Sequence, residues 1–225
     1  MTAASWQGLP AGFTVRLGRH TRVADDGAVL VGGSPTRVAR LKPPARAHLR
    51  AGEVVVRDAT SAALAEHLMA TGLADPVASA LPPVGLDRLT VVLPVKDRPG
   101  QLRRLLASLP KGLAGTVVVD DGSAAPQAVA RLVGDHEATL VVRAVSGGPA
   151  AARNDGLRRV QTEFVAFVDS DAAVDPGCFE TLLRHFADPR LALVAPRVLG
   201  LDSAAPNWIT RYEVRPAHSG RSGTH

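Results

Sequence analysis

Hydrophobic positions along the chain follow two patterns. In the first third, apolar residues alternate with polar ones over short stretches, which is typical of half-buried β-strands. Further on, nearly continuous apolar runs such as "LTVVLPV" alternate with segments whose leucines recur at helical spacing. Prolines and glycine interrupt both patterns at residues 74–88, "ADPVASALPPVGLDR". We therefore predict a small domain over residues 1–82 and a larger one over 88–212, with 213–225 as a disordered tail.

The first domain is predicted to be small, mixed α+β and similar to a winged helix. Phe13, Val15 and Leu17 alternate as in a strand, and "TRVA" and "AVLV" flank an Asp-Asp-Gly turn as in a hairpin. The segment "TRVARL" is expected to add a strand, and residues 45–49 a short helix. Ser61 is expected to cap a second helix, "SAALAEHLMATG", that ends at its final glycine.

The second domain alternates strand and helix patterns. The predicted strands are "LTVVLPV", "GTVVVDDGS", "ATLVVRAV", "EFVAFVDSD" and "LALVAP". The predicted helices between them are "PGQLRRLLASL", residues 125–132, "PAAARNDGLRRV" and "GCFETLLRHF". This alternation predicts a mostly parallel sheet covered by helices on both faces. Because ligands of open α/β sheets bind beyond the carboxyl ends of the strands, the polar residues at those ends are the candidates for chemistry.

The run "FVAFVDSDAAVDPG" ends an apolar strand in two aspartates, Asp169 and Asp171. In an extended chain, residues two apart face the same side, so both carboxylates are expected to point at one ligand. Paired hard oxygens suit Mg²⁺ or Mn²⁺ holding a diphosphate. An isolated Asp-x-Asp is more often a solvated turn, so the assignment depends on the other strand ends.

Those other strand ends carry further candidates. Asp120 and Asp121 end the strand in "VVVDDGS", where a carboxylate can accept hydrogen bonds from a nucleobase or ribose, and Asp97 follows the first strand in "LPVKDRPG". In "VSGGPAAARNDG", Gly148 lies at the start of a helix whose free amides, with Arg153, are expected to meet an anionic diphosphate. Their occurrence at successive ends of one sheet favours a nucleotide site over unrelated turns and caps.

Composition narrows the classes of function. The chain has 225 residues, of which 46% are hydrophobic, so it can bury a core. Its net charge of +5 comes from arginines spread through every segment, and only 4% of residues are aromatic, which argues against nucleic-acid binding. The single cysteine, Cys178, excludes an internal disulfide and a cysteine-rich metal site. No apolar run reaches about 18 residues and no signal-peptide pattern opens the chain, so we expect a cytoplasmic location.

The ordered motifs "VVLPVKDRP", "VVVDDGS", "SGGPAAARNDGL" and "FVAFVDSDAAVDPGCFE" closely resemble those of family 2 glycosyltransferases. The resemblance spans residues 89–200 and implies the GT-A nucleotide-diphospho-sugar transferase fold, with a Rossmann-like, mostly parallel sheet. It also implies that Asp121 approaches a uracil ring, that Asp169 approaches the ribose and the metal, and that Asp171 is the direct metal ligand. The candidate nucleotide-sugar site comprises Pro94, Val95, Asp97, Asp120, Asp121, Gly148, Arg153, Asn154 and Asp169, and the candidate ligands of Mn²⁺ or Mg²⁺ are Asp169 and Asp171.

The first domain resembles the small PqqD-like peptide-recognition fold, through "GFTVRLGRHTRVADDGAVLVGGSPTRVARL" and "HLMATGLADP". A PqqD-like region ahead of a family 2 transferase resembles the mycofactocin biosynthesis glycosyltransferases of actinobacteria. That resemblance implies a metal-dependent, inverting transfer of glucose from UDP-glucose to a peptide-derived redox cofactor. The implied partners are the UDP-sugar donor, the peptide-derived acceptor and a precursor peptide at the N-terminal domain.

Inverting transfer requires a general base that removes the acceptor proton. In the family this base comes from an acidic motif well downstream of the metal-binding pair, and the chain ends at His225 before such a motif. Asp202 and Glu213 are the only late acids, and both are expected to be surface residues. After "NWITRYE" the apolar periodicity is lost. We therefore expect a truncated protein with an incomplete acceptor site. In full-length relatives, the downstream part of the chain can include membrane-associating segments.

Two other classes of protein share some of these features. A sugar-phosphate nucleotidyltransferase uses a related sheet and metal, but it carries a glycine- and arginine-rich phosphate loop directly after the first strand, which "PVKDRPGQL" lacks. The alternative is a peptide-binding or winged-helix DNA-binding module joined to a degenerate nucleotide-binding domain. A DNA-binding winged helix needs a basic recognition helix, whereas "SAALAEHLMATG" contains no Arg or Lys. Peptide binding therefore fits the first domain better.

Overall fold

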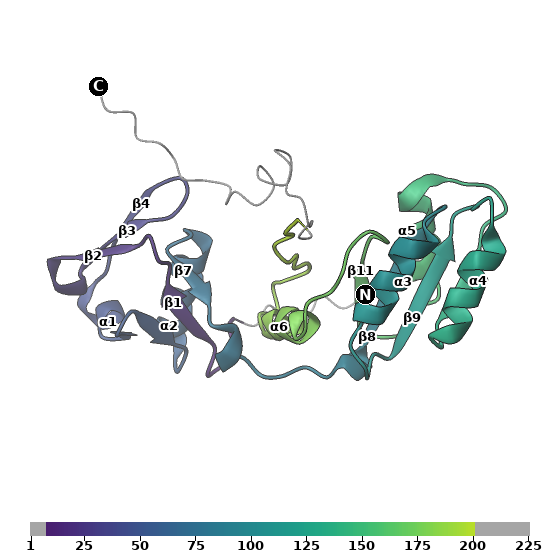
Figure 1. Ribbon diagram of the computed structural model, residues 1–225. Coiled ribbons are helices and arrows are strands. Elements are labelled where there is room, and N and C mark those ends of the chain that lie inside the picture. The colour runs from purple at the N-terminus through teal and green to yellow at the C-terminus, as the bar shows by residue number, and fades with distance from the viewer. Residues whose placement is uncertain (1–7, 201–225) are drawn as a thin grey trace, which may run out of the picture. The chain divides into compact units, whose positions relative to one another are not determined.

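The computed structural model describes residues 8–200 (Figure 1). Buried side chains group into a first hydrophobic core that extends from Leu9 to Leu81 and into cores of a second region that begin at Leu89. The predicted tail over 213–225 and the two late acids lie outside the described residues. None of the helices that the structure describes is long and apolar enough to cross a membrane.

Two antiparallel sheets and two helices enclose the first core. The strands are β1 (Thr14–Leu17), β2 (Arg22–Ala24), β3 (Val29–Gly32), β4 (Arg37–Arg40), β5 (Leu49–Arg50), β6 (Glu53–Val55) and β7 (Ala74–Pro76), and the helices are α1 (Pro43–Arg46) and α2 (Ala59–Ala70). The strand orders are β5-β6-β1-β7 and β2-β3-β4. Phe13 and Val15 are buried, as their alternation predicted, and the hairpin β2–β3 turns at Asp25–Gly27.

The helix boundaries of this region differ from the prediction in two places. The short helix α1 lies at Pro43–Arg46 rather than at 45–49, because Leu49 and the residue after it pair with β6 as a strand. The cap of α2 is Asp58 rather than Ser61. Ser61 instead completes a reciprocal capping box: its amide donates to Asp58 Oδ1 over 2.8 Å, and its Oγ accepts from the Asp58 amide over 2.9 Å.

Four parallel strands form the sheet of the second region. They are β8 (Leu89–Val95), β9 (Gly115–Asp120), β10 (Thr139–Val142) and β11 (Phe164–Phe167), in the order β10-β9-β8-β11. The helices are α3 (Pro99–Ser108), α4 (Pro126–Asp135), α5 (Gly148–Leu157) and α6 (Cys178–Arg184). All seven residues of β8 are buried, which explains why this strand is apolar in the sequence at every position except Thr90.

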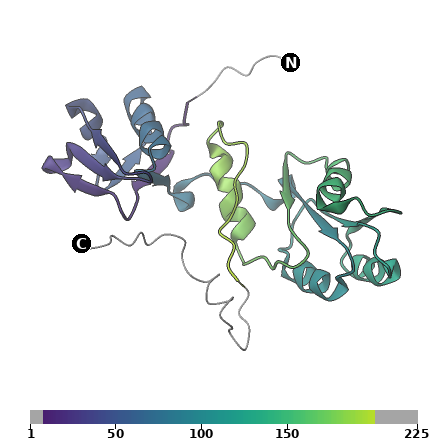
Figure 2. The same ribbon diagram turned by 90° about the horizontal axis from the view of Figure 1, so that it is seen from above.

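Helices cover both faces of this sheet, as predicted (Figure 2). On one face, Leu102 and Leu105 of α3 share a core with Val129 of α4. On the other face, Ala152 of α5 packs with Val92 and its neighbours on β9. Because the four strands are parallel, the loops that follow them all lie at the same edge of the sheet, at the carboxyl ends of the strands.

One predicted strand of the second region is wrong. The segment "LALVAP" is not a strand: residues 191–200 contain no helix or strand, and Leu193 is 79% exposed. An apolar run becomes a strand only when a neighbour satisfies its backbone, and no described strand lies beside it. In the first region, β7 lies where prolines and glycine interrupt the sequence pattern: Ala74 and the two residues after it pair with β1, inside the predicted first domain.

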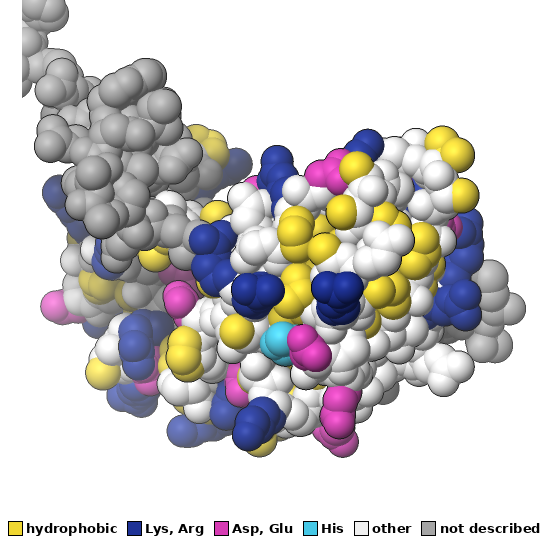
Figure 3. All heavy atoms as spheres, turned by 45° about the vertical axis from the view of Figure 1, so that its right-hand side comes forward, with side chains coloured by type: hydrophobic (Ala, Val, Ile, Leu, Met, Phe, Trp, Pro, Cys, Tyr) yellow, Lys and Arg dark blue, Asp and Glu magenta, His cyan; other side chains and the backbone are white. Residues whose placement is uncertain are grey.

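Part of the second region exposes apolar side chains. Val142 and Val145, at and after the end of β10, are 58% and 78% exposed. On the face shown in Figure 3, hydrophobic side chains gather in a group, and Lys and Arg side chains lie dispersed around it. The basic residues there are interspersed with other types, as their scatter along the sequence predicted.

Candidate functional site

The loops after β8 and β9 are tied together by Asp97. Its amide donates to Ser123 Oγ over 2.9 Å, and its Oδ1 accepts from the Ala124 amide over 2.7 Å. Asp97 has a φ of 54°, a left-handed conformation that aspartate tolerates better than most residues. Pro94 and Val95 are buried at the end of β8 directly before this loop. The first predicted site residues therefore lie at the carboxyl edge of the central strands.

The side chain of Asp121, directly after β9, accepts four hydrogen bonds. Its Oδ1 accepts from Arg143 Nη1 over 2.8 Å and from the Gly147 amide over 3.0 Å. Its Oδ2 accepts from Ser146 Oγ and from the Gly148 amide, both over 2.8 Å. Burial alone would raise the pKa of this carboxyl, but the hydrogen bonds and the Arg143 charge together hold the pKa below its ordinary value. Asp121 is thus an internal anion that organises the loop before α5.

This network corrects one prediction. The amides at the start of α5 were expected to be free for a diphosphate, yet those of Gly147 and Gly148 donate to Asp121. A carboxylate at a helix N-terminus satisfies unpaired amides and complements the helix dipole, so Asp121 occupies the position predicted for a ligand anion. The sequence could not reveal this because Asp121 and Gly148 lie 27 residues apart.

Asp120 has a different environment from its neighbour. Its side chain is completely buried, and its Oδ1 accepts from the Ser123 amide over 2.9 Å. Its Oδ2 is buried and has no hydrogen-bond partner among the described residues. Buried carboxylate oxygens are normally satisfied, so this oxygen retains capacity to accept one more hydrogen bond at the end of β9.

Asp169 and Asp171 do not continue the strand as predicted. β11 ends at Phe167, and the chain turns at Ser170 and Asp171. The alternation of an extended chain therefore does not apply to the two acids. Asp169 pairs with Arg153, and Asp171 Oδ2 lies 3.2 Å from Arg98 Nη1.

Helix α5 carries Arg153 and Asn154 to this edge. Arg153 contacts Asp169 across the loop after β11, whereas Asn154 is exposed. Gly156, two residues further along the same helix, allows its close approach to the sheet: a Cβ there would lie 2.4 Å from Val92 Cγ1. The glycine of "ARNDGL" therefore sets how deeply Arg153 lies against the strands.

Three arginines at this edge were missed by the sequence reasoning. Arg143 follows β10 and bridges Asp121 to Asp155, whose Oδ2 lies 2.9 Å from its Nε. Arg98 lies at the start of α3 and Arg104 lies within this helix, and both contact Asp171. The available signal was position: Arg143 directly follows β10, and Arg98 lies in the loop after β8, so both lie at strand ends as the predicted aspartates do.

Asp169 and Asp171 are the carboxylates at this edge that could bind Mg²⁺ or Mn²⁺. No group of three or more His, Cys, Asp or Glu side chains in residues 8–200 is arranged to hold a metal ion. A cation bound together with a nucleotide needs only one or two carboxylates, because phosphate oxygens and water complete its shell. Asp169 and Asp171 supply hard oxygens and are 60% and 55% exposed, so they fit this kind of site.

A parallel sheet with acids and arginines at the carboxyl ends of its strands is the arrangement expected for a nucleotide-sugar transferase. The family model described as glycosyl transferase family 2 matches residues 90–222, which is more than half of the chain. The chain therefore belongs to glycosyl transferase family 2, and the predicted family and GT-A-like α/β architecture are confirmed.

A curated relative matches most of the chain. The chain is 47% identical over 208 residues to the pre-mycofactocin glycosyltransferase of Mycobacterium tuberculosis, and the match covers 91% of the chain but 43% of the relative. It is also 39% identical over 120 residues to the succinoglycan biosynthesis protein ExoW of Rhizobium meliloti, covering 46% of the chain and 36% of that protein. The chain thus spans less than half the length of these relatives.

Solved structures match shorter parts of the chain. The mannosyltransferase PcManGT from Pyrobaculum calidifontis, in complex with GDP-Man and Mn²⁺, is 28% identical with a TM-score of 0.41, over 48% of the chain and 33% of that protein. S. aureus TarS 1-349 in complex with UDP is 30% identical with a TM-score of 0.36, over 44% and 31%.

Proposed function

We propose that the chain carries the donor-binding part of a glycosyltransferase that moves glucose from UDP-glucose to a peptide-derived acceptor in mycofactocin biosynthesis. The observation that carries the proposal is the 47% identity to the pre-mycofactocin glycosyltransferase over 91% of the chain. The sheet edge described above supports it, because the charged residues that the family motifs assign to the donor lie there. The peptide-derived nature of the acceptor and the inversion of configuration at the sugar are likewise parts of this proposal.

Each group at the sheet edge has a role in this proposal. The unpartnered Oδ2 of Asp120 is available to accept a hydrogen bond from the donor, while Asp121 keeps the loop before α5 in place. Asp169 and Asp171 would hold Mn²⁺ or Mg²⁺, which when bound neutralises charge on the leaving diphosphate. In this proposal the guanidinium of Arg153, which pairs with Asp169, would bind the same diphosphate and stabilise the charge that develops on it.

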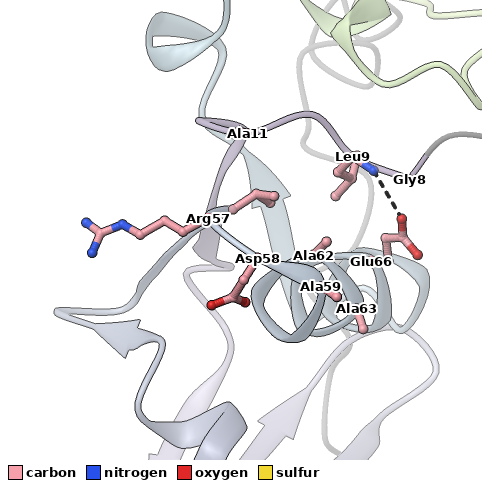
Figure 4. A pocket seen from close by; sticks show the side chains of 10 residues that line it. Gly8, Leu9, Ala11, Arg57, Asp58, Ala59, Ala62, Ala63 and Glu66 are labelled. Carbon is pink, nitrogen blue, oxygen red and sulfur yellow. Dashed lines mark hydrogen bonds between the residues drawn. The ribbon is translucent and has the colours of Figure 1, made fainter.

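The first domain is proposed to bind the precursor peptide. A cavity of about 440 Å³ lies between the segment at Gly8 and helix α2 (Figure 4). Alanines line its helix side, and the Leu9 amide donates to Glu66 Oε1 over 3.3 Å at one end. A groove with small apolar side chains and a carboxylate at one end suits an extended peptide, which offers both amides and side chains.

Calorimetry of UDP and UDP-glucose, with and without Mn²⁺, tests the donor site. The wild-type chain is expected to bind both ligands only with Mn²⁺, and Asp171→Asn is expected to weaken that binding at least about tenfold, because one hard oxygen ligand is lost. Asp175→Asn is the matched control, since Asp175 is exposed four residues further along the same loop. A folded wild-type chain that binds neither ligand would contradict the proposed function.

A further inference from the structure

Each acid assigned to the metal is paired with an arginine from a different element. Arg153 of α5 pairs with Asp169, and Arg98 pairs with Asp171. Arg104 adds a hydrogen bond of 2.9 Å from its Nη2 to the backbone oxygen of Asp171. The negative charge that would attract a divalent cation is therefore already balanced by internal cations.

Arg98 has the more informative position of the two arginines. It is the N-cap residue of α3 and lies directly after Asp97, whose hydrogen bonds to the β9 loop fix the backbone there. It reaches from the loop after β8 to the loop after β11, and these two strands are neighbours in the sheet. Its guanidinium therefore lies at the edge where the donor is proposed to bind.

The pairing of Arg98 with Asp171 is weak enough to exchange. Both side chains are 55% exposed, and an exposed ion pair of this kind contributes little to stability. A diphosphate offers a guanidinium a bidentate, charge-assisted partner, which is stronger than one long contact to an exposed carboxylate. An arginine that leaves Asp171 for a diphosphate also frees the carboxylate for a cation.

We propose that Arg98 is a counter-ion that passes from Asp171 to the donor diphosphate, so that binding of the nucleotide and of the divalent cation each favours the other. Arg153 and Asp169 repeat the same arrangement on the α5 side of the edge. The inference rests on the proposed donor site and adds an order of binding. The cation binds weakly to the free chain, and it binds tightly once Arg98 has moved from Asp171 to the diphosphate. Coupling of this kind is reciprocal, since each ligand must raise the affinity of the other by the same factor.

The test compares Arg98→Gln with Arg103→Gln by calorimetry of Mn²⁺ alone, of UDP alone and of UDP with saturating Mn²⁺. In Arg98→Gln, Mn²⁺ alone is expected to bind about two- to fivefold more tightly, because no guanidinium then competes for the carboxylate of Asp171. UDP in the presence of Mn²⁺ is expected to bind about tenfold more weakly, because its diphosphate loses a charged partner. Arg103 is an exposed arginine of the same helix with no ion pair among the described residues, so its variant should match the wild type in every titration.

Opposite shifts for the two ligands distinguish an exchange from a purely structural role. A misfolded or loosened variant would lose both affinities together, and Arg98→Lys should restore most of the wild-type behaviour by keeping the charge. Unchanged Mn²⁺ affinity in Arg98→Gln, or a shift of both affinities in the same direction, would overturn the inference while leaving the donor site intact. Absence of UDP binding in the folded wild-type chain would instead remove the proposed function, and the inference with it.

Discussion

At the scale of single residues, Asp121 shows how a strand-end acid can serve the site without touching a ligand. Its side chain is 6% exposed, and both oxygens accept from the loop that precedes α5. Removing one partner of such a buried, charge-assisted network leaves the other donors without an acceptor, which costs more than the network contributes in total. The residue is therefore expected to matter first for stability.

We predict that Asp121→Asn destabilises the chain by about 2 to 4 kcal/mol, because the amide offers one acceptor oxygen where the carboxylate offered two. Urea denaturation followed by circular dichroism measures the effect. Asp135→Asn is the control, since Asp135 is exposed at the end of α4 and should change the free energy of unfolding by less than about 0.5 kcal/mol. Equal stability of the two variants would refute the structural role of Asp121.

The lowered pKa of Asp121 adds a pH dependence to this prediction. A carboxyl whose pKa is lower in the folded than in the unfolded state contributes stability above its unfolded value of about 3.9, and that stability is lost as pH falls through the folded pKa. The stability difference between the wild type and Asp121→Asn should thus be full near neutral pH and shrink as the pH falls below about 4. A difference that stays constant in urea titrations down to about pH 3 would contradict this assignment.

At the scale of elements, α5 links the packing of the sheet to the position of Arg153. Gly156→Ala would place a Cβ 2.4 Å from Val92 Cγ1 and 3.0 Å from Val119 Cγ2. We predict a destabilisation of about 1 to 3 kcal/mol and a weaker affinity for UDP with Mn²⁺, because the helix must move outward with its arginine. Gly134→Ala in α4, where a Cβ meets nothing within 4 Å, should be neutral or slightly stabilising.

A second substitution tests whether the clash is the cause. In a Val92→Ala background the closest contact is removed, so Gly156→Ala should cost less there than in the wild type. Thermal unfolding of the four chains gives this coupling directly. Additive effects would show that the glycine acts through something other than its contact with β8.

The sequence predicted elements well where local pattern determines them. β8 is apolar except for Thr90 because both faces of the sheet bury it, and its prediction needed no knowledge of its neighbours. The pattern failed where the outcome depends on distant partners. "LALVAP" has a strand-like composition but no described neighbour, and the turn at Ser170 separates two acids that an extended chain would align. The partners of Asp121 were likewise hidden, because they lie more than 20 residues away.

At the scale of the whole molecule, the two proposed binding sites belong to regions with separate hydrophobic cores. The charged sheet edge belongs to the region from Leu89 onward, whereas the cavity beside α2 is lined by residues of the first core region. The family motifs predicted the first surface, while nothing in the spacing of Gly8 and the α2 alanines indicated a cavity. One chain therefore carries both a proposed peptide site and a proposed donor site.

The peptide site is tested by a substitution that fills the cavity without touching the sheet. Ala63 lines the cavity on the exposed side of α2, so Ala63→Arg is expected to weaken binding of the precursor peptide at least about tenfold, because its long side chain occupies the space of the ligand. Arginine is a good helix former, so α2 should remain stable. Ala70→Arg adds the same charge at the exposed last residue of α2, outside the cavity, and should bind the peptide as the wild type does.

Fluorescence anisotropy of a labelled peptide measures the affinities, and titration with UDP and Mn²⁺ should give equal values for all three chains. Peptide binding that survives in Ala63→Arg would place the peptide elsewhere, and loss in both variants would indicate charge repulsion rather than a filled cavity.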